Sequence, residues 1–589
     1  MAKIEEAELK TLDLVKSAEL GINYLTRNPL PNQNPELNYL PYFGGKIPLK
    51  GLPRFERTPW DYGDGTGRFL EALILTREMT GNKDRQGVDE GLKNLLITYL
   101  NENDGLSYRP ETPWSEYGAD IWAQRGTLLA LSLWYEKTKD REIIKRLNKL
   151  VTGLSRIAVR EGECAYLKYF WTGRDWLNEG NTGICFALLD GLNKYFEVSN
   201  DERVLGLAVS LVKGMLYRKP SYFNSDGSFA YPDESLKPDV FAVPHVDGVS
   251  KIPEVAVAWE IANGHVTSRV SAAVGIIHLG IITGNKEYIE WGKRIHDWLY
   301  RQGSTFGWIP ENVRTAGREV SEMCNLVDMI DMQMSLGRHG YPEYWDCVEQ
   351  YVRNHLMECQ FGVTPALMEL ISDNLKENPP ADTDKFSYQN VLERLTGGFV
   401  GPIYPNDLFT SYPKSRENPT AEKLIDISGC CAPSGIKALY MAWSNIVTKD
   451  DKGIWINLAL SRKTKWVDVI SYVPYQGRID IVVHETVPIY VRIPGWVSRA
   501  DVRVLIDEEE KRCEWDNGYI VRKPATAGQR LSIRYLLRKF SKEEILAGIP
   551  YSVTWEGDTV VSISTDKEPI LGIYNRRHFM EDKILMKEG

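Results

Sequence analysis

The stretch Ser268-Arg269-Val270-Ser271-Ala272-Ala273-Val274-Gly275-Ile276-Ile277 leads to the turn Thr283-Gly284-Asn285-Lys286, and this pattern decides the fold. Apolar and small residues lie on all sides of the first segment, which is typical of a helix that is buried on every face. The segment after the polar turn is more amphipathic. The pattern therefore predicts a helical hairpin, with an inner helix followed by an outer one.

The same hairpin pattern recurs along the chain. Further inner helices are predicted after Gly67, Arg125 and Gly183, and each runs into a polar turn. A fifth hairpin starts at Cys324, and the apolar helix after Cys431 supplies a later member. About six such hairpins close into an (α/α)6 toroid, whose long loops form a cleft at one end. A short open solenoid is the alternative.

The pattern changes after about residue 450. Short alternating runs such as Ile479–Val483 and Val487–Ile493 predict β-strands, and turns such as Asp516-Asn517-Gly518 separate them. We therefore expect two domains. Residues 1–450 form the (α/α)6 toroid, and residues 451–589 form a β-sandwich-like domain packed on it.

Composition excludes several classes of protein. The chain has 589 residues, 43% of them hydrophobic, and a net charge of −9, which argues against a nucleic-acid partner. No apolar run approaches the roughly 20 residues that span a bilayer, and no signal peptide is expected. Eight cysteines in this length do not suggest a disulfide framework. We expect a reducing, cytoplasmic location and no membrane partner.

The motif Gly429-Cys430-Cys431-Ala432-Pro433 places two thiols just before a predicted helix, where the helix dipole favours thiolates. A third thiol, Cys324, follows Glu322 by two residues, so both face one metal only from a loop or a first helical turn. Three cysteines and a glutamate are a plausible tetrahedral zinc set. Spacing alone does not bring Cys324 and Cys430 together, and inert buried thiols are the alternative.

The two cysteine motifs resemble a known family. Glu322-Met323-Cys324 and Gly429–Pro433, each before a helix, are similar to the Glu-x-Cys and Cys-Cys-x-Pro motifs of glycoside hydrolase family 127, which contains the β-L-arabinofuranosidases. Three more segments fit that family in order along the chain: Tyr62–Leu73, Gly264–Gly284 and Tyr490–Trp496.

The resemblance implies an (α/α)6 catalytic domain with β-sandwich material and a zinc ion held by Glu322, Cys324, Cys430 and Cys431. It also implies that Cys430 is the nucleophile of a retaining reaction, with a glutamate upstream as acid and base. Glu311 is our choice for that glutamate, because it follows a Gly-Trp-Ile-Pro turn and can face a cleft; Glu319 is the alternative.

We expect four residues to contact substrate: His265, Asp64, Asp120 and Arg125. Each has a structural alternative. His265 can be a structural histidine whose hydrogen bonds are all made within the protein. Asp64 and Asp120 can cap the next helix, and Arg125 can tie a loop to a helix. The sequence also departs from the family.

The departures lie where the family contacts its sugar. Asn181-Thr182-Gly183 stands in place of a His-Lys pair, Gln124-Arg125 in place of a histidine, and Ser434-Gly435 in place of Pro-Asn. The departures put the identity of the sugar in doubt more than the chemistry.

The sequence thus predicts a zinc-dependent retaining glycoside hydrolase that acts on a plant-type oligosaccharide or glycoside, with a β-L-arabinofuranoside as one candidate. One alternative is an (α/α)6 hydrolase or lyase that uses paired carboxylates such as Asp64 and Asp120. A second is a non-catalytic carbohydrate-binding protein with structural zinc. The expected partner is a carbohydrate, and a homo-oligomer is left open.

Overall fold

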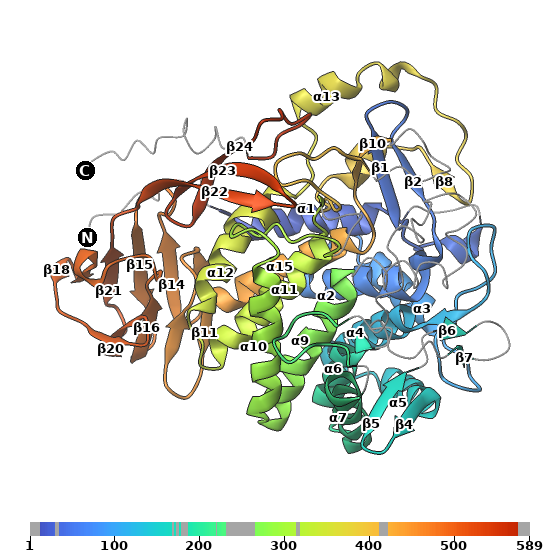
Figure 1. The fold of residues 1–589 in the computed structure, drawn as a ribbon, viewed down its shortest axis with the longest axis horizontal. Coiled ribbons are helices and arrows are strands. Elements are labelled where there is room, and N and C mark those ends of the chain that lie inside the picture. Colours follow the sequence, from blue (N-terminus) through green and yellow to red (C-terminus); the bar gives the residue numbers. More distant parts are fainter. Residues whose placement is uncertain are drawn as a thin grey trace.

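A computed structural model describes residues 12–29, 34–167, 170–171, 176–177, 186–218, 221–230, 265–313, 319–411 and 422–574. Six inner helices form a closed ring in which each contacts the next and the last contacts the first (Figure 1). They are α2 (Gly67–Thr80), α4 (Ile121–Thr138), α6 (Leu189–Ser199), α9 (Val266–Thr283), α11 (Met323–Arg338) and α15 (Cys431–Ile446).

Six outer helices pack around this ring. They are α3 (Gly87–Thr98), α5 (Arg141–Ile157), α7 (Glu202–Tyr217), α10 (Lys286–Tyr300), α12 (Tyr344–Tyr351) and α1 (Leu14–Arg27). The helix α1 contacts both α2 and α15, so the N-terminal helix is the outer partner that covers the closure of the ring. The predicted (α/α)6 toroid is confirmed, and the open solenoid is excluded.

Burial separates the two kinds of helix. Every residue of α4 from Ile121 to Leu133 is buried, whereas α5 buries one stripe that includes Ile143, Leu147 and Leu154. Small residues let the inner helices approach closely: a Cβ atom on Gly67 would lie 2.4 Å from the backbone of Gly126. The inner helices therefore meet backbone to backbone at this contact.

The repeated polar turns end one helix and begin the next. Gly81 and Gly284 follow α2 and α9 with left-handed φ angles of 70° and 68°, a conformation that glycine adopts without strain. The residue after Gly284, Asn285, caps α10 by accepting a hydrogen bond from the Glu287 backbone N–H at 2.9 Å. Asp140 and Asp201 cap α5 and α7 in the same way.

A five-stranded sheet lies beside the ring and leads into the cysteine motif. Its order is β8 (Phe386–Ser387), β2 (Arg54–Glu56), β1 (Gly44–Pro48), β10 (Lys423–Asp426) and β9 (Thr410–Ser411). Strand β10 ends four residues before Cys430, so its pairing with β1 positions the start of α15. Shorter pairings join β3 (Ala119–Asp120) to β6 (Phe170–Trp171) and β7 (Trp176–Leu177), and β4 (Ala158–Glu161) to β5 (Cys164–Leu167).

Short helical segments also connect the elements. They are η1 (Pro35–Leu37), η2 (Pro59–Asp61), η3 (Tyr62–Thr66), η7 (Val352–Leu356), α13 (Pro365–Ile371), η8 (Asn374–Lys376), α14 (Val391–Leu395) and η9 (Arg499–Asp501).

The C-terminal part is built from sheets, as predicted, and lies to one side of the ring (Figure 1). A five-stranded sheet contains β11 (Val447–Lys449), β12 (Ile454–Ile456), β16 (Val487–Arg492), β20 (Tyr519–Ala525) and β19 (Glu514–Asp516). A six-stranded sheet contains β13 (Arg462–Lys463), β14 (Val467–Ser471), β15 (Arg478–Val483), β21 (Arg530–Arg534), β17 (Arg503–Ile506) and β18 (Glu509–Glu510). A third sheet contains β22 (Lys539–Leu546), β23 (Ile549–Glu556) and β24 (Thr559–Ser564).

One arginine joins these sheets to the helical ring. Arg492, at the end of β16, donates to the carboxylate of Glu349 on α12 at 2.6 Å and also pairs with Asp346. Arg353 pairs with the other oxygen of Glu349, also at 2.6 Å. Glu349, Arg353 and Arg492 are buried, and a buried carboxylate is retained only when it is paired and hydrogen-bonded. The Tyr490–Trp496 segment therefore serves as a connection in this fold.

Within the described residues one helix, α9, is long and apolar enough to cross a membrane. It is an inner helix of the ring, and 78% of its apolar window is buried against other parts of the protein.

Candidate metal and active site

The predicted metal ligands meet at the start of two neighbouring inner helices. Glu322 precedes α11 and Cys324 lies in its first turn; Cys430 precedes α15 and Cys431 is its first residue. Because α11 and α15 are adjacent in the ring, residues far apart in the sequence face one another. Glu322 faces the group from the residue before α11 and Cys324 from its first turn, which agrees with the prediction of a loop or a first turn.

The distances in this group fit a tetrahedral metal site. Sγ of Cys430 lies 3.7 Å from Sγ of Cys431 and 3.7 Å from Glu322 Oε1, and Cys324 Sγ lies 4.0 Å from Cys431 Sγ. All four donor atoms lie within 4.8 Å of one another. Sulfurs bound at 2.3 Å to a tetrahedral zinc ion lie about 3.8 Å apart. The donor set and its spacing therefore fit zinc.

The electrostatics of the group point the same way. Hydrogen bonds from Cys430 and Cys431 hold the pKa of the Cys324 thiol well below its usual value. The same interaction raises the pKa of Cys430, and burial raises that of Cys431. Three thiols and a carboxylate this close do not all ionise without a positive charge, so the group as a whole favours a cation.

The three cysteines differ in exposure. Cys324 and Cys431 are 2% and 1% exposed, whereas Cys430 is only partly buried. Cys430 is thus the most exposed sulfur of the group.

Glu322 also belongs to a second group, with His265 and Glu311. His265 Nε2 lies 3.0 Å from Glu322 Oε2, and the Thr267 hydroxyl donates to the same oxygen at 2.6 Å. His265 Nδ1 lies 3.1 Å from the hydroxyl of Ser268, so both ring nitrogens have protein partners. Histidine and threonine therefore orient the Glu322 carboxylate; a contact between His265 and substrate stays a prediction.

Glu311 lies at the edge of this group. Its backbone N–H donates to the carbonyl of Val320 at 2.8 Å, and its carbonyl accepts from Val266 at 2.9 Å, which ties the Glu311 loop to the starts of α9 and α11. Burial, followed by the neighbouring Glu322 carboxylate, raises the pKa of Glu311 to about 8. The rival acid, Glu319, is exposed and lies outside both groups.

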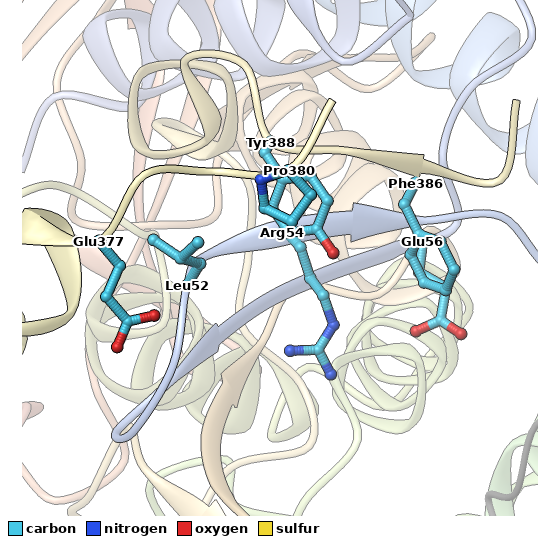
Figure 2. A pocket seen from close by; sticks show the side chains of 7 residues that line it. All are labelled: Leu52, Arg54, Glu56, Glu377, Pro380, Phe386 and Tyr388. Carbon is cyan, nitrogen blue, oxygen red and sulfur yellow. The ribbon is translucent and has the colours of Figure 1, made fainter. Parts of the chain in front are cut away.

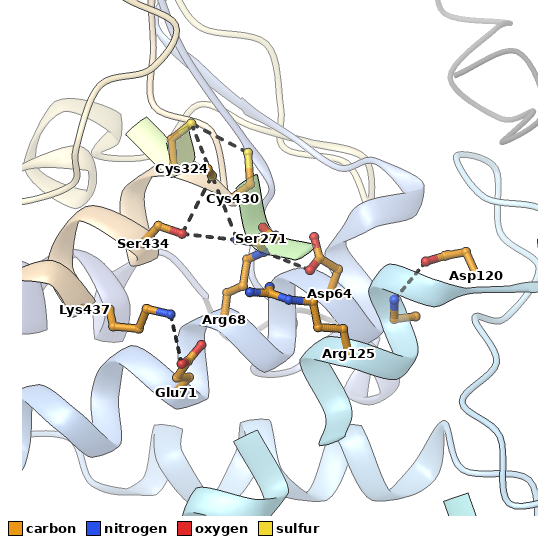
Figure 3. Close-up of polar contacts among 12 residues, drawn as sticks. Asp64, Arg68, Glu71, Asp120, Arg125, Ser271, Cys324, Cys430, Ser434 and Lys437 are labelled. Atoms are coloured by element: carbon orange, nitrogen blue, oxygen red, sulfur yellow. Dashed lines mark hydrogen bonds and ion pairs between the residues drawn. The ribbon is translucent and has the colours of Figure 1, made fainter. Parts of the chain in front are cut away.

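Arg68 connects Asp64 to the sulfur cluster (Figure 3). The Asp64 carboxylate accepts from Arg68 Nε at 2.8 Å, and Arg68 Nη1 lies 3.2 Å from Ser434 Oγ and 3.9 Å from Cys324 Sγ. Arg68 is not among the predicted site residues, and Ser434 stands out in the sequence only as a departure from the family. The signal that marks them is their position, since both lie in the first turns of inner helices.

Asp120 and Arg125 are engaged within the protein. Asp120 caps α4 through the Ala123 N–H at 2.8 Å and pairs with Arg109 at 2.5 Å. Arg125 pairs with Asp190 on α6, also at 2.5 Å. Gln124, where the family has a histidine, bonds the backbone of Ser107 in both directions at 2.7 Å. Substrate contacts by Asp120 and Arg125 stay predictions.

Each inner helix also contributes one polar residue to a set of six that pair between neighbouring helices, and on α11 and α15 these residues follow Cys324 by four positions and Cys431 by six. We call these residues the paired layer: Glu71, Arg125, Asp190, Ser271, Asp328 and Lys437. Lys437 pairs with Glu71 at 3.2 Å, and Ser271 donates to Asp328 at 2.5 Å. Figure 3 shows the Lys437–Glu71 pair below the sulfurs.

A cavity of about 350 Å³ lies elsewhere, on the sheet beside the ring (Figure 2). No predicted site residue lines it. Its lining residues are Leu52, Arg54, Glu56, Glu377, Pro380, Phe386 and Tyr388.

The Asn181-Thr182-Gly183 segment, at which the sequence departs from the family, lies outside the described residues, and so does Cys185. The remaining cysteines, Cys164, Cys347, Cys359 and Cys513, are free thiols away from the cluster.

No model of a known protein family matches the chain, and no curated protein matches it in sequence. Solved structures do match. A GH127 β-arabinofuranosidase has a TM-score of 0.56 and 14% identity over 94% of this chain and 82% of its own. A GH127 β-L-arabinofuranosidase from Geobacillus stearothermophilus T6 has a TM-score of 0.56 and 12% identity over 92% of this chain and 80% of its own. The chain therefore shares the fold of solved GH127 β-L-arabinofuranosidases, as the sequence motifs predicted.

Proposed function

We propose that this protein is a zinc-dependent retaining glycoside hydrolase with Cys430 as its nucleophile. The observation that carries the proposal is the convergence of Glu322, Cys324, Cys430 and Cys431 within 4.8 Å, with Glu311 beside them. A shared fold alone does not define an activity. Here a donor set suited to zinc, a partly exposed thiol and a carboxylic acid of raised pKa meet at one end of that fold.

Glu322, Cys324, Cys430 and Cys431 would hold the metal. When bound, zinc supplies the positive charge that keeps these sulfurs as thiolates at neutral pH. His265 and Thr267 fix the Glu322 carboxylate through Oε2, which leaves Oε1 directed toward the sulfurs.

The chemistry follows from Cys430 and Glu311. The Cys430 sulfur donates an electron pair to the anomeric carbon while the glycosidic C–O bond breaks and Glu311 gives its proton to the leaving oxygen. A thioglycosyl intermediate results. Glu311, now a carboxylate, then takes a proton from water as the water oxygen attacks the same carbon, and the C–S bond breaks with its electron pair returning to Cys430.

For the substrate we propose a plant-type oligosaccharide or glycoside, with a β-L-arabinofuranoside as the first to test. The solved neighbours act on arabinofuranosides, by their names. We propose Asp64, Asp120, Arg125 and His265 as hydroxyl contacts. Since the described cysteines are free thiols, we also propose a reducing, cytoplasmic location.

Metal content tests the first half of the proposal. The purified protein is expected to hold one zinc ion per chain, and Cys324→Ser is expected to lose it. The matched control is Cys513→Ser, which removes a thiol outside the cluster and leaves zinc content unchanged. Full activity in a metal-free protein would rule the proposal out.

A panel of aryl furanosides and pyranosides tests the second half. Turnover of an L-arabinofuranoside with retained anomeric configuration is the expected result. An intact sugar bound without turnover across the whole panel would instead identify a carbohydrate-binding protein with structural zinc.

A further inference from the structure

The three sulfurs of the cluster have different surroundings. Cys324 Sγ lies 3.7 Å from the Ser434 hydroxyl and 3.9 Å from Arg68 Nη1, both within hydrogen-bond range of sulfur. Within the described residues, the side-chain hydrogen bonds of Cys430 and Cys431 reach only other members of the cluster. Among the described residues, Cys324 is therefore the one sulfur of the three with side-chain hydrogen-bond partners outside the cluster.

These two donors are held firmly. Arg68 bonds Asp64 at 2.8 Å and lies over the Trp122 ring at 5.4 Å, and it is 8% exposed. Its Nη1 donates to Ser434 Oγ at 3.2 Å. Because the Ser434 oxygen accepts from Arg68, its own hydrogen is available to the sulfur. Once Cys324 is a thiolate, the hydroxyl is the only possible donor of this pair.

Hydrogen bonds to a thiolate withdraw charge from the sulfur and weaken it as a nucleophile. Groups outside the ligand set of a metal site also orient its ligands and strengthen metal binding. The two outside groups on Cys324, and the lack of such a group on Cys430 among the described residues, make the sulfurs unequal before any substrate binds.

We propose that Arg68 and Ser434 act as a donor pair that makes Cys324 a fixed metal ligand and leaves Cys430 as the reactive sulfur. The proposal rests on the zinc site of the proposed function. It adds a reason why two cysteines of that site differ in role, Cys324 as metal ligand and Cys430 as nucleophile. The residue type at position 434 is decisive. The family resemblance puts a proline there, which has no side-chain donor, so this chain achieves the inequality with a group of its own.

The test compares Ser434→Ala with the wild type in the zinc-loaded protein. Two quantities are measured: zinc affinity by chelator competition, and the separate rates at which iodoacetamide alkylates Cys324 and Cys430, followed by peptide mapping. Loss of the hydroxyl is expected to weaken zinc binding by about tenfold. It is also expected to raise the alkylation rate of Cys324 severalfold and leave that of Cys430 unchanged.

Two variants act as controls. Ser434→Thr restores a hydroxyl and is expected to recover both values. Ser271→Ala removes a buried hydroxyl that bonds Asp328 and not sulfur, and it is expected to match the wild type. Arg68→Lys, which keeps the charge but loses the planar fork, provides a second route with the same expected direction.

The outcomes separate the two proposals. If the wild type binds zinc but Ser434→Ala and Arg68→Lys match it in affinity and in Cys324 alkylation, the donor pair is refuted and the zinc site stands. If the wild type binds no zinc, both proposals fail. Faster alkylation at Cys430 rather than Cys324 would reverse the assignment of the sulfurs.

Discussion

Two successive layers of the same helical ring differ in whether their charged residues are paired with groups of opposite charge. In the paired layer, one polar residue from each inner helix has a partner on a neighbouring helix, as Lys437 has Glu71. Nearer the starts of these helices, three thiols, Glu322 and Glu311 lie close together, and Arg68 is a nearby cation. A layer that satisfies its own charges stabilises the fold, whereas a layer with an excess of anionic donors is suited to a cation and to chemistry.

The sharpest test of this contrast removes the proposed nucleophile. Cys430→Ser is expected to lower kcat by on the order of 10⁴-fold or more, because a serine hydroxyl is a far weaker nucleophile than a thiolate. The measurement is hydrolysis of the best glycoside in the panel, with Cys513→Ser as the matched control. Nearly full activity in Cys430→Ser would support the rival mechanism with paired carboxylates such as Asp64 and Asp120.

The next largest effect is expected at Glu311. Glu311→Gln removes the proton donor and is expected to lower kcat by about 10²- to 10³-fold. Its control is Glu319→Gln at an exposed position, which is expected to leave kcat unchanged.

The pH dependence of activity is an independent test of the role of Glu311. Burial raises the pKa of Glu311 to about 8, and the active form of a general acid is the protonated one. Activity is therefore expected to fall as pH rises through that pKa. A bound cation offsets the contribution of Glu322, so the falling limb lies at or below about pH 8 and above the ordinary value of 4.5. An unchanged limb in Glu311→Gln would assign it to another group.

The smallest effect is expected in the paired layer and appears in stability rather than activity. Lys437→Met leaves Glu71 partly buried without its partner and is expected to destabilise the protein by up to about 3 kcal/mol, measured as a lower Tm. Zinc content is expected to stay at one per chain. The control is Lys449→Met, which breaks the more exposed pair with Glu485 and is expected to change stability by less than about 0.5 kcal/mol.

If Lys437→Met loses zinc as completely as Cys324→Ser does, the paired layer also supports metal binding, and the separation of a stabilising layer from a metal-binding layer is wrong.

The sequence predicted the elements of the ring well because their signals are local. A helix that is apolar on all faces, such as α9, and a Gly-Asn turn that ends one helix and caps the next are readable from adjacent residues. The position of α1 over the closure of the ring was not predicted, because its contact with the last inner helix joins residues far apart in the sequence and leaves no local signal.

The candidate site could likewise be predicted from the sequence only where its signals are local. The spacing of Glu322 and Cys324 predicts that both face one group only from a loop or a first turn, but their meeting with Cys430 and Cys431 depends on α11 and α15 being neighbours. The roles of Ser434 and Thr267 could not be predicted, since a hydroxyl in a first turn more often bonds its own helix than a group on another one.

The position of α1 has a consequence for how the site is assembled. The helix that carries Cys430 and Cys431 rests on the first helix of the chain, so the two ends of the helical region must meet before the cysteine pair has its final support. During synthesis the earlier hairpins leave the ribosome and pack while the ring is still open. The four proposed metal ligands thus come together only once α15 has docked on α1 and α11, and on this proposal metal uptake would mark the completed helical ring.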